Sequence, residues 1–387
     1  MGINDIFYSQ EEIKFRNEVR EYATAEIQPL SNDFDKGLIK IRDMARKLGE
    51  RGYMGISMPK EYGGQGKSVV FEMILCEELG AVNYGIASIH VASSLFLGYP
   101  LVRFGTEEQK KKYLVPIATG QRVSGMGMTE PTAGSDVAGT RTTAVLEGDF
   151  YILKGEKRFI GCGSEADFLL TFAITDPSVH AHKGITAFIA ETSDPGFELV
   201  KVFDLLGWVG VGVSHLRYNN LKVPKDNVLG ELNQGFIVAG YELDAERVAA
   251  AAAGIGMART AFEIAVKYSS ERKQFDVPIR TFEGVSFKVA DMAIDLEAMS
   301  LLNLKVARMI QEGVKASKES AISKLFAAEG IFRVTNNALQ IMGGIGLTKD
   351  YPIEKFYRDA RGLSIAGGTN EILRYLIQRE VYKEFRL

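Results

Sequence analysis

Residues 236–272 read FIVAGYELDAERVAAAAAGIGMARTAFEIAVKYSSER, and this stretch decides much of the fold. Neither the stretch nor the wider interval between Pro224 and Pro278 contains a proline. A helical pattern of this length without a helix breaker predicts one long helix. Three more helical patterns follow, joined by short links, and together they predict a four-helix bundle. They cover Phe282 to Gln311, Ser317 to Met342 and Asn370 to Lys383.

The segment before this bundle has a different texture. From Ser124 to Pro224, short β-rich runs alternate with Gly and Pro. Two of them flank Glu147-Gly148-Asp149, a pattern typical of a hairpin. The segment therefore predicts an all-β domain, a sandwich or a barrel. The runs are Thr142 to Leu146, Tyr151 to Lys154, Phe168 to Ile174, Ile185 to Ala190, Phe197 to Val202 and His215 to Val223.

The first third of the chain is predicted to be helical. Apolar residues recur at roughly helical spacing as far as Pro29, Lys40 to Arg51 is amphipathic, and Val69 to Leu79 is more apolar. Thr106 with Gln109 predicts a capping box at the start of a further helix. We therefore expect an α+β multidomain protein. Its parts are an N-terminal helical domain at 1–122, a β-domain at 123–232 and a C-terminal four-helix bundle at 233–387.

Composition excludes several classes of function. The 387 residues are 46% apolar and 25% charged with a net charge of −3, so no nucleic-acid partner is expected. Cys76 and Cys162 form no CxxC pair, which favours a reducing compartment and a cytoplasmic location over a disulfide framework or a zinc site. Met1 to Gln10 lacks the pattern of a signal peptide. The small-apolar run Val248 to Ala258 is too short to span a bilayer. No metal-ligand cluster or histidine-based triad is expected.

Two glycine clusters resemble a dinucleotide fingerprint only faintly. Gly343-Gly344-Ile345-Gly346 and Gly254-Ile255-Gly256 do not follow a predicted strand, which disfavours a Rossmann site. Gly254 and Gly256 are better explained by close packing between helices.

Two loops in the β-region have the chemistry of a cofactor site. Residues 126–136, MGMTEPTAGSD, leave a strand and offer hydroxyls and free backbone donors, which suit a heteroaromatic ring edge and a phosphate. Residues 157–167, KRFIGCGSEAD, place an aromatic before a bend of small residues, which suits packing against a flat ring. On physical grounds alone, ordinary loops remain an equal alternative.

These two loops resemble the flavin-facing signatures of the acyl-CoA dehydrogenase family. The resemblance continues in the same order across nearly the whole chain, through YSSERKQF at 268–275, LQIMGG at 339–344, FYRDAR at 356–361 and GGTNEI at 367–372. Six motifs in register identify the chain as a member of that family. The resemblance implies a helical domain, a β-domain and a four-helix bundle, FAD as cofactor and an acyl-CoA thioester as substrate. It also implies electron-transfer flavoprotein as electron acceptor.

The resemblance further implies roles for individual residues. Met128 and Thr129 would meet the flavin ring, Ser135 would lie near phosphate, and Phe159 would cover one flavin face. Gly161 stands where a Thr or Ser usually bonds the flavin edge. Arg272 and Phe275 would reach the FAD of a neighbouring subunit, which implies a homo-oligomer, commonly a dimer of dimers. Gln340 and Gly344 would form part of the adenine and pyrophosphate site. The last FAD contacts would come from Thr369 and Glu371.

The resemblance also identifies a candidate base. Many members of the family carry a glutamate where this chain has Gly367, and glycine cannot act as a base. A minority branch, including isovaleryl-CoA and long-chain acyl-CoA dehydrogenases, carries it on an earlier helix, at the position of Glu246. Glu246 would take the α-proton while a hydride leaves the β-carbon for flavin N5. The thioester oxygen would be bonded by the backbone N–H of Asn370 or its neighbour. Asp244 and Arg247 match positions that hold the pantetheine arm.

The chain departs from the family pattern at two further positions. Val209 and Val211 follow Gly207 where an arginine and a serine are usual. This departure motivates a second hypothesis, a flavoenzyme that acts on a carrier-protein thioester or reduces an unusual enoyl thioester. A third hypothesis is an FAD-binding protein without turnover. The length and branching of the acyl group are not encoded in any motif.

Overall fold

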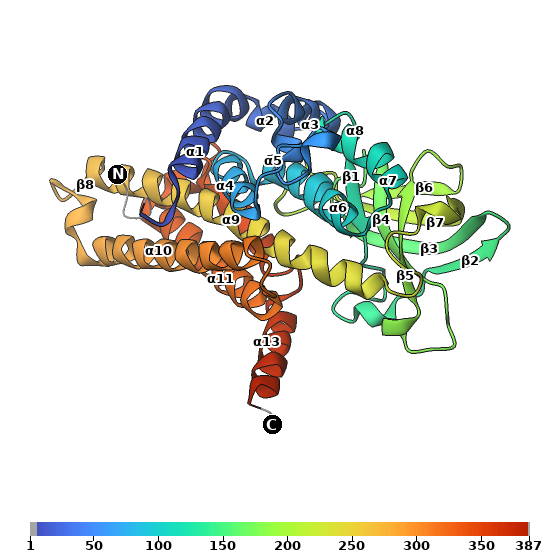
Figure 1. The fold of residues 1–387 in the computed structure, drawn as a ribbon. Helices are drawn as coiled ribbons and strands as arrows, with labels where there is room; N and C mark the ends of the chain where they lie inside the picture. Colours follow the sequence, from blue (N-terminus) through green and yellow to red (C-terminus); the bar gives the residue numbers. More distant parts are fainter. Residues whose placement is uncertain (1–5, 386–387) are drawn as a thin grey trace.

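The computed structural model describes residues 6–385, which fold into helices, then a sheet, then longer helices (Figure 1). The outer limits predicted for the first and third domains lie in 1–5 and 386–387, outside the described residues. The first half of the stretch Met1–Gln10 lies outside them too. The predicted succession of a helical, a β and a helical domain is confirmed.

The first part is made of short helices joined by π-helical and 3-10 turns. Thr106 and Gln109 form the predicted reciprocal capping box at the start of α7. The helix predicted after it contains a π turn, Lys110–Leu114, before α8. A second π turn, Val91–Gly98, joins α5 to α6. The helices are α1 Gln10–Tyr22, α2 Ser31–Asp35, α3 Ile41–Glu50, α4 Val69–Gly80, α5 Tyr84–His90, α6 Tyr99–Phe104, α7 Glu107–Gln109 and α8 Val115–Ala118.

The second part is one seven-stranded sheet with the order β1-β4-β2-β3-β7-β6, in which β5 also pairs with β4. β1 and β2 lie one after the other along the same edge of β4. β1 pairs with the first four residues of β4, and β2 pairs with the last one, Ile174. The predicted hairpin is present, with Glu147 and Phe150 paired across a two-residue turn. The strands are β1 Ser124–Gly127, β2 Thr143–Glu147, β3 Phe150–Ile160, β4 Phe168–Ile174, β5 Ile185–Glu191, β6 Phe197–Val202 and β7 Ser214–Pro224.

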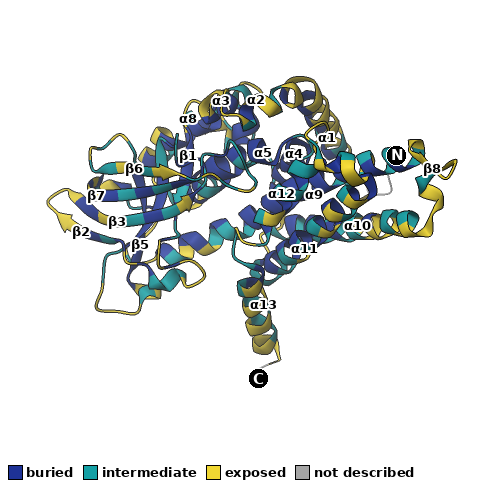
Figure 2. Cartoon of the chain, turned by 180° about the vertical axis from the view of Figure 1, so that it is seen from behind, coloured by how far each residue is buried: buried dark blue, intermediate teal, exposed yellow. Residues whose placement is uncertain are grey.

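The third part contains the long helices that the proline-free intervals predict. α9, α10 and α11 lie side by side, and α13 projects away from them toward the C-terminus (Figure 1). Most of α13 beyond its first turns is exposed (Figure 2). The elements are α9 Gly235–Glu271, the two-residue strands β8 Lys273–Gln274 and β9 Val277–Pro278, α10 Glu283–Gln311, α11 Ser317–Met342, α12 Ile353–Leu363 and α13 Asn370–Glu384.

Glycines allow α4 and α9 to pack in backbone contact. A Cβ on Gly256 would lie 1.8 Å from the carbonyl oxygen of Glu77, and one on Gly80 would lie 2.1 Å from that of Ala253. On another face of α9, a Cβ on Gly254 would meet Ile331 of α11 at 2.5 Å. The prediction that Gly254 and Gly256 serve close helix packing is therefore confirmed. This packing makes α9 the central helix to which both helical parts are fixed.

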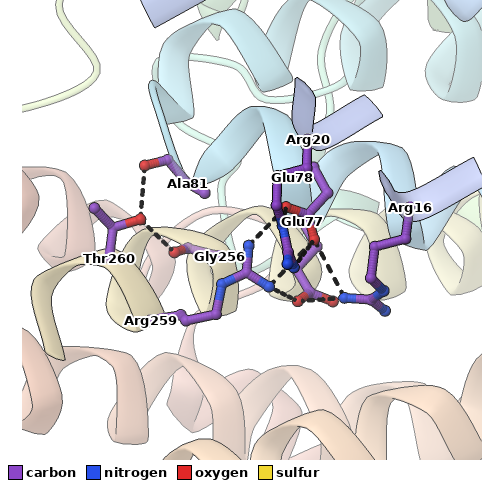
Figure 3. Close-up of polar contacts among 8 residues, drawn as sticks. All are labelled: Arg16, Arg20, Glu77, Glu78, Ala81, Gly256, Arg259 and Thr260. Atoms are coloured by element: carbon purple, nitrogen blue, oxygen red, sulfur yellow. Dashed lines mark hydrogen bonds and ion pairs between the residues drawn. The ribbon is translucent and has the colours of Figure 1, made fainter. Parts of the chain in front are cut away.

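A buried ion network also fixes α1 and α4 to α9 (Figure 3). Arg259 of α9 donates to Glu77 at 2.6 Å and to Glu78 at 2.8 Å, and Arg16 and Arg20 of α1 donate to the same two carboxylates. Glu78 is 1% exposed, so these three guanidinium groups replace the water that its charge would otherwise need.

Two helical segments are long and apolar enough to cross a membrane by length and composition alone. They are Tyr84–Phe104 and α9, and 78% and 72% of their apolar windows are buried inside the protein. A central core helix passes the same test, so they are weak evidence for a span. The expected absence of a membrane span stays a prediction.

Candidate active site

Glu246 lies in the first third of α9 with its carboxylate turned toward the turn that precedes α13. A Cβ built on Gly367 would lie 3.0 Å from both carboxylate oxygens of Glu246. The two positions, 121 residues apart in sequence, therefore face the same small volume. Because residue 367 is a glycine and has no side chain, the carboxylate of Glu246 can lie against its backbone.

The surroundings of Glu246 suit a base. Its side chain is 6% exposed, and among the described residues its Oε2 has no hydrogen-bond partner. Burial raises the pKa of the Glu246 carboxyl above its ordinary value, although Arg247 and Lys324 oppose that rise. A buried carboxylate with a raised pKa and a free oxygen is suited to accept a proton from a bound molecule.

The turn Gly367-Gly368 is held by two buried cations. Arg247 Nε donates to the Gly367 carbonyl at 3.4 Å, and Lys324 Nζ donates to the Gly368 carbonyl at 2.8 Å. Both glycines have positive φ, 67° and 93°, a conformation that side-chain-bearing residues rarely adopt. Within residues 6–385 the amides of Gly367 and Gly368 make no hydrogen bond, so both remain available to a ligand.

The thioester donor was predicted to be the amide of Asn370 or its neighbour, and the Asn370 amide is not available for this role. That N–H donates to the carbonyl of Ser364 at 3.1 Å as α13 begins, so it is not free to bond a thioester oxygen. The side chain of Asn370 does face the interior, where it is 7% exposed and its Oδ1 has no partner in the described chain. In the described chain the amides of Gly367, Gly368 and Thr369, the neighbour of Asn370, make no hydrogen bond and are the free donors of this turn.

Asp244 and Arg247 are bound to the start of α11. Ser317 and Ser320 donate their hydroxyls to the two oxygens of Asp244 at 2.9 and 2.7 Å. Arg247 lies 3.6 Å from Asp244 and is 6% exposed. These contacts place both residues beside Glu246 but also explain them as a structural charge pair, so their predicted role at the pantetheine arm stays a prediction.

A second buried carboxyl group beside Glu246 was missed by reasoning from the sequence. Glu242 lies one helical turn earlier on the same face of α9, is 0% exposed, and has no partner for either oxygen among the described residues. Burial and the neighbouring Glu246 hold the pKa of Glu242 well above its ordinary value, which keeps this carboxyl neutral. The sequence did carry a signal for this pair, because residues four apart, such as Glu242 and Glu246, are neighbours on one face of a helix.

In the β-domain, the two predicted flavin loops lie against each other. Arg158 donates its backbone N–H to the carbonyl of Thr129 at 2.7 Å, directly after Met128. Behind this contact, Lys157 and Glu130 form a buried pair at 2.8 Å. Burial opposes the charge on Glu130, but Lys157 and three hydrogen bonds lower its pKa to about 2. This pair fixes the loop backbone, while Ser135 further along it is exposed.

Phe159 has the features expected of a residue that covers a flat ligand. It is 55% exposed with φ 61°, an unusual backbone conformation for an aromatic residue, and its ring lies 5.0 Å from that of Phe203. Gly161 follows in the same bend. Strained backbone of this kind is typical of ligand-binding sites.

The segment that contains the two unusual valines also reaches this site. The carbonyl of Val211 accepts the N–H of Cys162 at 2.9 Å, so the segment is bonded to the Phe159 loop. Trp208 stacks on Tyr84 at 5.2 Å, and its indole N–H has no partner in the described chain. A cavity of about 390 Å³ opens beside Trp208, Val209 and Phe203; Glu246 does not line it.

Four predicted cofactor residues lie far from Glu246 in the same chain. Arg272 follows α9, 26 residues after Glu246, which corresponds to about 39 Å along a helix. Phe275, at the tip of the β8–β9 hairpin, is 89% exposed. Gln340 and Gly344 lie exposed at the end of α11. One chain therefore does not bring these residues to Glu246. Thr369 does lie beside the site, where its hydroxyl caps α13 at Ile372, and Glu371 occupies the first turn of that helix.

Comparison with known proteins decides the family. Family models of the acyl-CoA dehydrogenase N-terminal, middle and C-terminal domains match residues 9–121, 125–221 and 233–382. The 3-(aryl)acrylate reductase of Clostridium sporogenes is 40% identical over 98% of this chain and 100% of its own length. This chain belongs to the acyl-CoA dehydrogenase family. It is an FAD-dependent oxidoreductase, as the resemblance in the sequence implied.

Solved structures of relatives agree over the full fold. The butyryl-CoA dehydrogenase of Megasphaera elsdenii superposes with a TM-score of 0.93 at 35% identity, covering 98% of this chain and 100% of that one. A chain from work on the electron transferring flavoprotein of Acidaminococcus fermentans superposes with a TM-score of 0.94 at 40% identity, covering 98% and 99%. The exposed Phe159 with its positive φ, and the loop of residues 126–136 bonded to the residue before it, fit the FAD that this family binds.

Proposed function

We propose that this acyl-CoA dehydrogenase interconverts an acyl-CoA thioester and its α,β-unsaturated counterpart, with Glu246 as the base at the α-carbon. The observation that carries the proposal is the 3.0 Å approach of the Glu246 oxygens to the Cβ position of residue 367. It supports a base position like that of the isovaleryl-CoA and long-chain branch. When bound, FAD supplies the acceptor for the hydride from the β-carbon.

The chain's own residues supply the rest of the chemistry. Burial keeps water from Glu246, so that its carboxylate is a stronger base toward the weakly acidic α-hydrogen. Negative charge then develops on the thioester oxygen, and the amides of Gly367, Gly368 and Thr369 are the donors available to stabilise it. In the reverse direction, protonated Glu246 returns a proton to the α-carbon.

Glu246→Gln tests the assignment of the base. We expect the variant to keep its FAD and its thermal midpoint but to lose reduction of the flavin by butyryl-CoA under anaerobic conditions. The amide has the shape of the carboxyl group but cannot accept the proton. Glu263→Gln, an exposed position on the same helix, is the matched control and should reduce the flavin at the wild-type rate. Unchanged bleaching in Glu246→Gln would reject the assignment.

Reduction of an enoyl thioester is the second candidate for the physiological direction. Val209 and Val211 replace the usual arginine and serine beside the Phe159 loop, and the similar protein of C. sporogenes is named as a reductase. Enzyme reduced with dithionite should be reoxidised faster by a 3-arylacryloyl-CoA than oxidised enzyme is reduced by the saturated thioester. The opposite order favours dehydrogenation.

Electron-transfer flavoprotein is the electron partner that we propose. The similar chain from the A. fermentans work was studied together with such a protein. Steady-state turnover should require this flavoprotein as acceptor in the oxidative direction.

A homo-oligomer is required if the remote FAD residues act as proposed. Arg272 and Phe275 are too far along α9 to serve the Glu246 of their own chain, so they would serve a second copy. The outer face of α10 adds exposed apolar side chains, Phe287 at 62% and Ile294 at 67%, which a second copy would cover.

A cytoplasmic location is proposed from the cysteine usage alone.

A further inference from the structure

Lys324 is a buried cation that the base chemistry described above does not use. It lies on α11, is 2% exposed, and makes one hydrogen bond, from Nζ to the carbonyl of Gly368 at 2.8 Å. A lysine ammonium has three donors and loses hydration when buried. Such a group is costly unless it has a function at the point that it contacts.

The contact point is the turn beside Glu246 whose amides make no hydrogen bond in the described chain. Two successive residues with positive φ and no side chains cannot hold this turn by their own packing. In a trans peptide the N–H points opposite to the C=O of the same unit. Fixing the Gly367 and Gly368 carbonyls toward Arg247 and Lys324 therefore directs the N–H groups of Gly368 and Thr369 away from these cations.

Of the two cations, Lys324 holds the turn more closely. Arg247 contacts the Gly367 carbonyl at 3.4 Å and is also engaged by Asp244 and Ser320. Among the described residues, Lys324 has only its 2.8 Å bond to Gly368. A bond from a charged donor at this distance is about twice as strong as a neutral one.

We propose that Lys324 is a positioning residue, whose ammonium holds the Gly367-Gly368 turn against Glu246 so that the amides of Gly368 and Thr369 bond the thioester oxygen. The inference deepens the proposed function and rests on it. It assigns the stabilisation of the developing enolate to a chain of two contacts, from α11 to the turn and from the turn to the substrate.

The charge on Lys324 responds to pH in the working range. Burial lowers the pKa of Lys324 to about 8, and the positive charge of Arg247 on α9 lowers it further. The negative charges of Glu246 on α9 and Glu371 on α13 partly oppose this fall. Above that pH the ammonium loses its proton, and the charged bond to Gly368 becomes a weaker neutral one. The free enzyme should therefore lose kcat/KM on the alkaline side of about pH 8.

Two variants of the FAD-loaded enzyme separate charge from structure. Lys324→Met removes the bond, and we expect kcat/KM for butyryl-CoA at pH 7 to fall about 100-fold, as for a displaced catalytic group. Lys324→Arg keeps its charge at every pH tested, so its kcat/KM should not decline between pH 8 and 9.5 as the wild type does. Lys305→Met, an exposed lysine on α10, is the control and should match the wild type at each pH.

Amide hydrogen exchange gives a readout that does not depend on turnover. Peptides covering residues 366–370 should exchange about tenfold faster in Lys324→Met than in the wild type. A Lys324→Met enzyme with wild-type kcat/KM, exchange and alkaline decline overturns the proposal. If Lys324→Met does not fold, an unchanged alkaline decline in Lys324→Arg overturns it instead. If no thioester reduces the wild-type flavin, the proposed function fails, and the exchange result still decides whether Lys324 holds the turn.

Discussion

The closeness of Glu246 to Gly367 can be measured without any substrate by giving residue 367 a Cβ atom. In Gly367→Ala, the positive φ of 67° imposes a cost of about 1–2 kcal/mol on an L-residue. The new methyl group would also lie 3.0 Å from both oxygens of Glu246, closer than ordinary van der Waals contact. The carboxylate must then move by a few tenths of an ångström, and an off-rotamer shift adds about 0.5–1.5 kcal/mol.

Gly313→Ala isolates the first of these two costs. Gly313, between α10 and α11, has φ 69° and nothing within 4 Å of its Cβ position. It therefore reports backbone strain alone. Thermal midpoints of the FAD-loaded variants should fall further for Gly367→Ala than for Gly313→Ala, by about 2 °C for each additional kcal/mol. In a Glu246→Ala background this excess should disappear, because the carboxylate is gone.

Activity provides a second measure of the same contact. A displaced base should slow flavin reduction by butyryl-CoA between about 10- and 100-fold in Gly367→Ala, while Gly313→Ala should leave it unchanged. The reasoning is refuted if Gly367→Ala costs no more than Gly313→Ala and that cost is the same with and without Glu246. The carboxylate would then not lie beside residue 367.

Two further predictions concern the buried acid and the assembly. Burial keeps a proton on Glu242 that the unfolded chain releases above about pH 4.5, so this residue disfavours folding more as the pH rises. Glu242→Leu should therefore raise the thermal midpoint more at pH 8 than at pH 5, and an equal gain at both would contradict the neutral buried acid. Phe275→Ala, at the exposed hairpin tip, should lower FAD content together with oligomer size on gel filtration. A smaller species that retains full FAD would contradict the shared cofactor site.

The long elements could be predicted from the sequence because their signals are local. The proline-free interval around residues 236–272 predicted α9 to within one residue at each end. The alternation around Glu147 and Phe150 predicted the hairpin, and Thr106 with Gln109 predicted the capping box. The π turn Val91–Gly98 carries no such signal in the sequence, and it lies where the chain packs against β1 and α9, far along the sequence.

The site could be predicted only in part, because its contacts join distant segments. The resemblance singled out Glu246 and Gly367, but it left the oxyanion donor as Asn370 or its neighbour, and the Asn370 amide is used to start α13. Lys324 and Glu242 read as ordinary helix charges in a linear sequence. Their burial is decided by which helix faces meet, and the Gly368 carbonyl that Lys324 holds comes from a turn 44 residues away.

The glycine at 367 and the glutamate at 246 are two parts of one arrangement. A side chain beginning at 367 would start 3.0 Å from both Glu246 oxygens, so a carboxylate there would lie against that of Glu246. Two unpaired carboxylates there could not both be ionised, and one would lose its ability to act as a base. In the proposed mechanism the turn must nevertheless keep its shape, because its amides stabilise the charge that proton removal creates. Arg247 and Lys324 hold the turn by its carbonyls, so the proposed donors to the thioester stay in place beside a base that comes from α9.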